Sequence, residues 1–137
     1  MRIVLDTSVL VSMILGGTVG ELIDEWDADN FQVIASAEVV TEYARVLARP
    51  KFGLTRDIVE AILGYVQRKI EFVAPTEQIA VIEDDPKDDM FLACAAAVQT
   101  DYIVSGDQHL LALGNFRGIP IITPRAFLDL LEKSKRK

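Results

Sequence analysis

Four acidic residues stand where a short apolar segment ends or where a helical pattern begins: Asp6, Glu42, Asp89 and Asp107. In an open α/β sheet the ends of the parallel strands meet at one edge, and ligands bind there. Carboxylates gathered at such an edge repel one another unless their pKa values rise or they bind a hard cation such as Mg²⁺ or Mn²⁺. The pattern therefore predicts a metal site.

Each acid also has a simpler structural explanation. Asp6 and Asp107 could be N-caps of helices, and Asp88 and Asp89 open a helix, where the macrodipole favours negative charge. Neighbouring helical residues point about 100° apart, so only one of that pair can face the cluster, and the apolar pattern does not decide which. Glu42 lies on or beside an apolar stripe, where a carboxylate without a partner is costly. Four such acids at strand ends favour one shared site.

The elements that must position these acids alternate between strands and helices. Apolar runs predict strands at 2–5, 31–35, 72–73, 102–105 and 120–122. Helices are predicted at 9–15, 19–26, from Ser36 to before Pro50, after Thr55, and at 90–98, 107–113 and 124–132. This order predicts a single α/β domain, residues 1–132, with one parallel sheet and helices on both faces, followed by a basic tail, 133–137.

Charge argues against a protein that binds nucleic acid by electrostatics alone. The chain has 137 residues, suited to one domain, and its 21 acidic against 14 basic residues give a net charge of −7. Basic residues nevertheless gather after Glu42, at Arg45, Arg49 and Lys51. They are candidate RNA contacts, and a solvated helix face explains them equally well.

Several other classes of protein lack their characteristic residues here. Cys94 lies in an apolar run and predicts a buried thiol rather than a nucleophile. No cysteine or second histidine completes a zinc set with His109, and no glycine-rich phosphate loop occurs. No apolar run approaches the ~20 residues of a membrane span, and Asp6 interrupts any signal-peptide core, so we expect a cytoplasmic protein without a membrane partner.

The order of the acidic motifs resembles that of the PIN-domain ribonucleases, particularly the toxins of bacterial and archaeal toxin–antitoxin pairs. The resemblance spans Met1 to about Phe127. It rests on the following segments: 3–12 (IVLDTSVLVS), 39–42 (VVTE), 85–95 (DPKDDMFLACA) and 101–111 (DYIVSGDQHLL). The implied fold is a PIN-like, Rossmann-like α/β/α sandwich.

The resemblance also implies roles for individual residues. Asp6, Glu42, Asp89 and Asp107 would be both the catalytic residues and the ligands of one or two Mg²⁺ or Mn²⁺ ions. Asp89 is selected over Asp88 because the family's third acid stands three residues before an apolar-then-small step, here Leu92-Ala93. The implied supporting residues are Thr7, Ser8 and Ser105, although Ser8 stands where many members have asparagine. Whether Asp85 or Asp88 assists the site stays open.

The implied activity is that of a metal-dependent endoribonuclease. A divalent ion lowers the pKa of a bound water and neutralises charge on the scissile phosphate, and the expected products carry 5′-phosphate and 3′-hydroxyl ends. We expect single-stranded or looped RNA as substrate, because an acidic surface with one metal-filled notch grips a long duplex poorly. The implied partners are a basic antitoxin and a second copy of the chain.

Two rival readings come from other classes. A phosphotransfer domain of the haloacid-dehalogenase type needs a second acid two residues after Asp6, where this chain has Ser8; a receiver domain needs a late lysine that is not evident. A catalytically silent PIN fold, serving as an RNA-binding or protein-docking scaffold, is the remaining alternative. Retention of all four acids argues against it.

Overall fold

The computed structural model describes residues 1–17, 19–77, 79 and 88–135. The strands are β1 (Arg2–Leu5), β2 (Gln32–Ala35), β3 (Glu71–Phe72), β4 (Tyr102–Val104), β5 (Asn115–Phe116) and β6 (Ile119–Ile122). The helices are α1 (Thr7–Ile14), α2 (Glu21–Asp27), α3 (Ala37–Leu47), the 3₁₀ helix η1 (Pro50–Phe52), α4 (Arg56–Lys69), α5 (Asp89–Val98), α6 (Gln108–Leu113) and α7 (Pro124–Lys135). Asp85, Arg136 and Lys137 lie outside the described residues.

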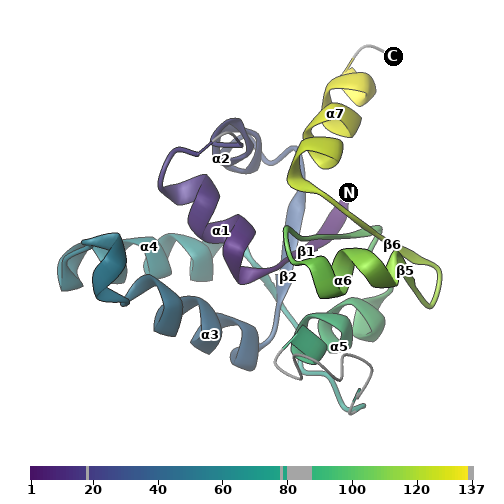
Figure 1. The fold of residues 1–137 in the computed structure, drawn as a ribbon, viewed down its shortest axis with the longest axis horizontal. Coiled ribbons are helices and arrows are strands. Elements are labelled where there is room, and N and C mark those ends of the chain that lie inside the picture. The colour runs from purple at the N-terminus through teal and green to yellow at the C-terminus, as the bar shows by residue number, and fades with distance from the viewer. Residues whose placement is uncertain (18, 78, 80–87, 136–137) are drawn as a thin grey trace.

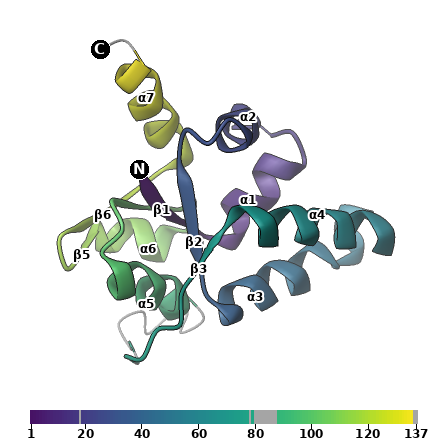
Figure 2. The ribbon, with the colours of Figure 1, turned by 180° about the vertical axis from the view of Figure 1, so that it is seen from behind.

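The strands form one mixed sheet in the order β3-β2-β1-β4-β6-β5. All neighbouring strands are parallel except β5 and β6. Helices α1 to α4 lie on one side of the central strands and α5 and α6 on the other (Figures 1 and 2). The predicted single α/β domain with helices on both faces is confirmed.

One strand corrects the prediction of a wholly parallel sheet. Asn115 and Phe116 pair antiparallel with β6 at the sheet edge. The chain reverses between them at Arg117 and Gly118, with φ angles of +52° and +86°, and Gly118 donates a hydrogen bond of 3.0 Å to the Asn115 side chain. This hairpin adds an antiparallel edge to an otherwise parallel sheet.

The core lies around β1, which has a strand on each side and helices over both faces. Ile3, Val4 and Leu5 are fully buried, as expected of a strand covered on both sides. Cys94 on α5 is also buried, in agreement with the sequence, and burial raises the pKa of its thiol. None of the described helices is long and apolar enough to cross a membrane.

The C-terminal helix is longer than the sequence indicated. Helix α7 continues to Lys135, so the first residues of the predicted basic tail are helical. The Lys135 ammonium forms an ion pair with Glu25 on α2, which explains how this end of the helix is held. The boundary between the domain, residues 1–132, and a basic tail, residues 133–137, stays a prediction.

Candidate metal-binding active site

Asp6 follows β1 directly and is the most constrained acid of the four. Its backbone N–H donates to the carbonyl of Val104 on β4, at 3.1 Å, and its side chain is only 3% exposed. Oδ1 accepts hydrogen bonds from Val9 N at 2.9 Å and Ser8 Oγ at 2.8 Å. The carboxylate therefore caps α1, so the helix begins at Thr7, two residues earlier than predicted.

The second oxygen of Asp6 joins β1 to the end of β4. Oδ2 accepts from Gly106 N at 3.2 Å and from the hydroxyl of Ser105. The same hydroxyl oxygen accepts from the backbone N–H of Asp107, at 2.9 Å. Ser105 is fully buried and connects the first and fourth acids, and the supporting role that the resemblance implies for it stays a prediction.

Asp107 has one oxygen engaged and one open. Oδ1 caps α6 by accepting from His109 N at 2.8 Å and Leu110 N at 3.3 Å. Oδ2 makes no hydrogen bond within the described part of the chain. Capping and ligation are therefore compatible at this residue. His109 itself is exposed on α6.

Glu42 is held by a neighbour on its own helix. The Arg45 guanidinium binds both carboxylate oxygens, with Nε 3.0 Å from Oε2 and Nη2 2.6 Å from Oε1. The Glu42 side chain is 16% exposed and that of Arg45 47%. This ion pair offsets the cost of placing a carboxylate beside the apolar stripe of α3.

Asp89 is the first residue of α5 and lines a cavity of about 600 Å³. The cavity is lined by Glu38 and Ser36 at the start of α3 and by apolar residues after β3. Asp88 precedes the helix and is 8% exposed. Both acids thus lie at this helix start, and the choice between them rests on the family pattern.

The structure brings two of the four acids into one hydrogen-bonded unit, Asp6 and Asp107. Glu42 and Asp89 come from α3 and α5, which pack against each other. Within the described residues, no group of three or more His, Cys, Asp or Glu side chains is placed to hold a metal ion. Convergence of all four carboxylates therefore stays a prediction that requires Glu42 to leave Arg45.

Carboxylates nevertheless suit a hard cation as a donor set. Mg²⁺ and Mn²⁺ prefer oxygen ligands, and the hydrogen bonds to Asp6 fix that carboxylate in place before any ion binds. Thr7 adds a hydroxyl that is buried and makes no hydrogen bond among the described residues. The donor set at the end of β1 thus fits the metal that the sequence predicts.

Tyr43 contributes to the site in a way that the sequence did not reveal. Its hydroxyl donates a hydrogen bond of 2.6 Å to the carbonyl oxygen of Leu5. Burial raises the pKa of Tyr43 well above its ordinary value, and the negative charge of Asp6 adds to the shift. In the sequence, Tyr43 belongs to the apolar stripe of α3 and is indistinguishable from an ordinary core residue. Only the need of a buried tyrosine hydroxyl for an acceptor could have indicated this contact.

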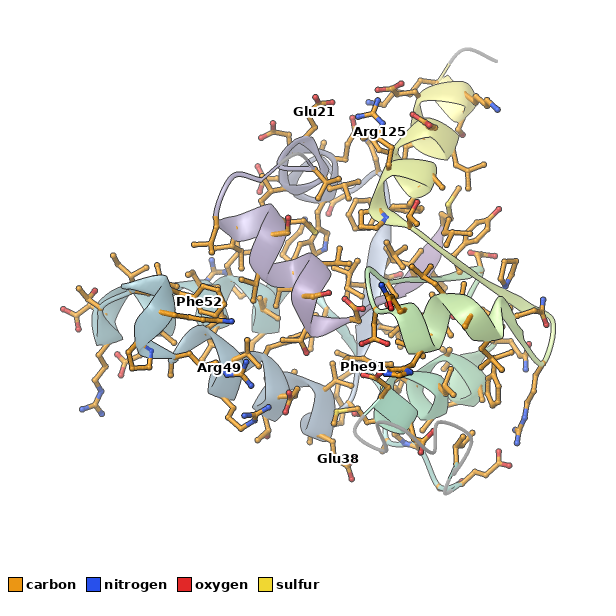
Figure 3. The ribbon with its side chains drawn as sticks, viewed as in Figure 1. Glu21, Glu38, Arg49, Phe52, Phe91 and Arg125 are labelled. Atoms are coloured by element: carbon orange, nitrogen blue, oxygen red, sulfur yellow. The ribbon has the colours of Figure 1, made fainter. Side chains whose placement is uncertain are left out.

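Two of the candidate RNA contacts lie farther along the chain from Glu42. Arg49 and Lys51 are exposed and follow the end of α3, and the Lys51 ammonium lies 5.1 Å from the centre of the Phe52 ring. Figure 3 shows Arg49 and Phe52 toward the far end of α3 from Glu38. The exposed positions suit a solvated face as well as an RNA contact.

The sequence model of the PIN domain matches residues 2–109, which include all four acids. The chain belongs to the PIN-domain family. PIN domains are generally nucleases and generally use divalent metal ions. No curated protein matches this PIN domain in sequence.

Two solved structures share its fold. One is PAE2754 from Pyrobaculum aerophilum, with a TM-score of 0.66 and 15% identity over 97% of this chain and 90% of the other. The second is VapBC2 from Rickettsia felis, bound to a DNA fragment from its promoter, with a TM-score of 0.61 and 11% identity over 90% of this chain and 98% of the other. At these identities the likeness shows the PIN fold alone.

Proposed function

We propose that this PIN domain is a metal-dependent endoribonuclease that cleaves single-stranded or looped RNA. The observation that carries the proposal is the buried link from Asp6 through Ser105 to Asp107, at the sheet edge where β1 and β4 end. In this proposal Asp6, Glu42, Asp89 and Asp107 hold Mg²⁺ or Mn²⁺. The ion would supply a water of lowered pKa and neutralise charge on the scissile phosphate.

Individual residues would have separate roles in binding the cation and the RNA. Asp6 accepts four hydrogen bonds, which use the lone pairs of its carboxylate, so it would bind the cation once the rotatable hydroxyl of Ser8 or Ser105 turns away. Glu42 would have to leave Arg45 to serve as a ligand, and the guanidinium would then be available to an RNA phosphate. Metal binding and RNA binding are then coupled, because one ion pair must open for both.

We further propose that the protein is the toxin of a toxin–antitoxin pair. VapBC2, which shares the fold, is a toxin–antitoxin complex. An acidic site in a chain of net charge −7 attracts a basic antitoxin segment, which would occupy the place of the cation. A homodimer and a cytoplasmic location belong to the same proposal.

Cleavage of labelled RNA, with and without Mn²⁺, tests the activity. We expect single-stranded RNA to be cut by the wild type with Mn²⁺, not with chelator, and not by Asp107→Asn. This variant is informative because asparagine caps a helix as well as aspartate does, so its fold should be unchanged. RNA that is bound but never cut would instead establish the silent scaffold, and duplex cut as fast as single strand would refute the substrate class.

A further inference from the structure

A second cavity, of about 280 Å³, begins beside Asp6 and runs between α1 and the start of α7. Ser8 and Gly106 line its inner end, and both donate hydrogen bonds to the Asp6 carboxylate. Ser12, Thr123 and Arg125 line it farther out. The cavity is thus continuous with the proposed catalytic centre.

Charge separates this cavity from the larger one near Asp89. Among the residues that the structure describes, the lining of the larger cavity includes Glu38, Glu77 and Asp89 and no basic residue. The described residues that line the smaller cavity include Arg125 and no acid. In a chain of net charge −7, a basic cavity next to the acidic centre favours an anionic ligand.

Two of the residues that line the cavity, Arg125 and Thr123, can donate hydrogen bonds to a ligand. Arg125 is 64% exposed and its Nη2 lies 3.5 Å from the Asp129 carboxylate, a long and solvated pairing that is readily exchanged. The oxygen of Thr123 accepts from Ala126 N at 3.1 Å, which leaves its hydroxyl proton for a ligand. Arg125 is the second residue of α7, and Figure 3 labels it beside that helix. A guanidinium fork with a hydroxyl beside it matches the oxygens of a phosphate.

We propose that this cavity is a subsite for the backbone phosphate adjacent to the scissile one, with Arg125 as its principal contact. The inference rests on the proposed ribonuclease function and adds a path for the strand: from α7, over Ser8 and Gly106, to Asp6. A strand that follows this path would meet Arg125 on α7, and in the proposed function Arg45 on α3 would be a second basic contact.

A mutant cycle with modified RNA tests the subsite. The cut position is first mapped on a single-stranded RNA, and each phosphate near it is then replaced, one at a time, by an uncharged methylphosphonate. At one position next to the cut, we expect the methylphosphonate to weaken RNA binding by the wild type about tenfold. The same replacement should leave RNA binding by Arg125→Gln unchanged. Arg125→Gln should also lower the slope of log affinity against log salt by about 0.7, the value for one phosphate of a single strand.

Arg56→Gln is the matched control. Arg56 also pairs with an acid four residues on, Glu60, at 3.2 Å, and is 91% exposed, but it lies on α4, away from α7 (Figure 1). The Arg56→Gln variant should bind the unmodified RNA and each methylphosphonate RNA as the wild type does. If the wild type cuts RNA and no methylphosphonate position distinguishes it from Arg125→Gln, the subsite is refuted while the ribonuclease function stands. If the wild type neither binds nor cuts RNA, both proposals fail.

Discussion

The hydroxyl of Tyr43 donates a hydrogen bond to the carbonyl oxygen of Leu5, the residue directly before Asp6. Tyr43 is also the direct neighbour of Glu42. One buried hydrogen bond therefore fixes α3 against the end of β1 and sets the distance between two of the proposed metal ligands. Ordinary core packing would hold the helix near the sheet, but it would not fix this register.

Replacing Tyr43 with phenylalanine tests that function. The variant leaves the buried carbonyl of Leu5 without its donor, so the free energy of unfolding should fall by about 1–3 kcal/mol. The affinity for Mn²⁺, measured by calorimetry, should fall as well, since Glu42 loses its register with Asp6. Tyr65→Phe is the control, because the Tyr65 hydroxyl bonds Asp27 on the surface at 3.0 Å; it should leave Mn²⁺ affinity unchanged. Equal affinities in wild type and Tyr43→Phe would contradict the assigned role.

The raised pKa of Tyr43 predicts a loss of stability in alkali. The unfolded chain loses this proton near pH ~10, whereas the folded chain keeps it to higher pH because the hydroxyl is buried and close to Asp6. The stabilisation that the protonated Tyr43 hydroxyl contributes is complete below pH ~10, and it declines as the pH rises toward the pKa of Tyr43 in the folded chain. Urea unfolding between about pH 9 and about pH 11 should therefore show the stability difference between wild type and Tyr43→Phe becoming smaller. Tyr65, with a pKa raised to about 12, is present in both proteins and cancels.

Asp6→Asn should abolish cleavage and also weaken the fold. Relief of charge repulsion, considered alone, predicts a more stable variant. The hydrogen bonds predict the opposite, because each carboxylate oxygen accepts from a backbone N–H, Val9 on Oδ1 and Gly106 on Oδ2. An amide NH₂ must face one of these donors, which costs about 1–3 kcal/mol. Thermal unfolding decides: a higher melting temperature would mean that repulsion dominates.

Ser105→Ala removes the link between Asp6 and Asp107. A buried hydroxyl that both donates and accepts is lost, so we expect a destabilisation of about 1–3 kcal/mol together with weaker Mn²⁺ binding. Thr55→Ala is the control. It removes a hydroxyl that caps α4, where Thr55 Oγ1 accepts from Ile58 N at 3.2 Å. It should lower stability by about 1 kcal/mol without changing metal affinity. Weakened binding in both variants would indicate a general effect of stability.

Arg45→Gln should strengthen metal binding. Arg45 occupies both oxygens of Glu42, so it competes with any cation for that ligand, and its removal frees the carboxylate. The Arg45 side chain is 47% exposed, so the fold should tolerate the change. A Mn²⁺ titration monitored by calorimetry should give a lower Kd than for wild type or Arg56→Gln. An unchanged or higher Kd would mean that Glu42 is not a ligand.

The sequence predicts the parts of the fold that depend on long apolar runs. Ile3-Val4-Leu5 and Val33-Ile34-Ala35 are strands in the structure because a strand covered on both faces needs an unbroken apolar segment. Strand β5 was missed because it is two residues long, one of them Asn115, and its pairing arises from the turn at Gly118. Such a strand has no periodicity that a sequence pattern could detect.

For the site, residue types were predictable and their partners were not. The end of β1 identifies Asp6 as a candidate, but the bonds from Ser105 and Gly106 depend on the adjacency of β1 and β4, across 100 residues of sequence. The cost of placing Glu42 beside an apolar stripe was foreseen. The ion pair by which Arg45 offsets this cost depends on the rotamers of both side chains, which the sequence does not give. The cavity at Arg125 depends on where α7 begins.

Both edges of the sheet are two-residue strands, β3 and β5. An edge this short offers few unpaired backbone groups to a foreign strand, which is a common protection against amyloid-like growth and strand swapping. We therefore expect lasting association of this protein, with itself or with another chain, to depend on surface side chains rather than on pairing of its edge strands.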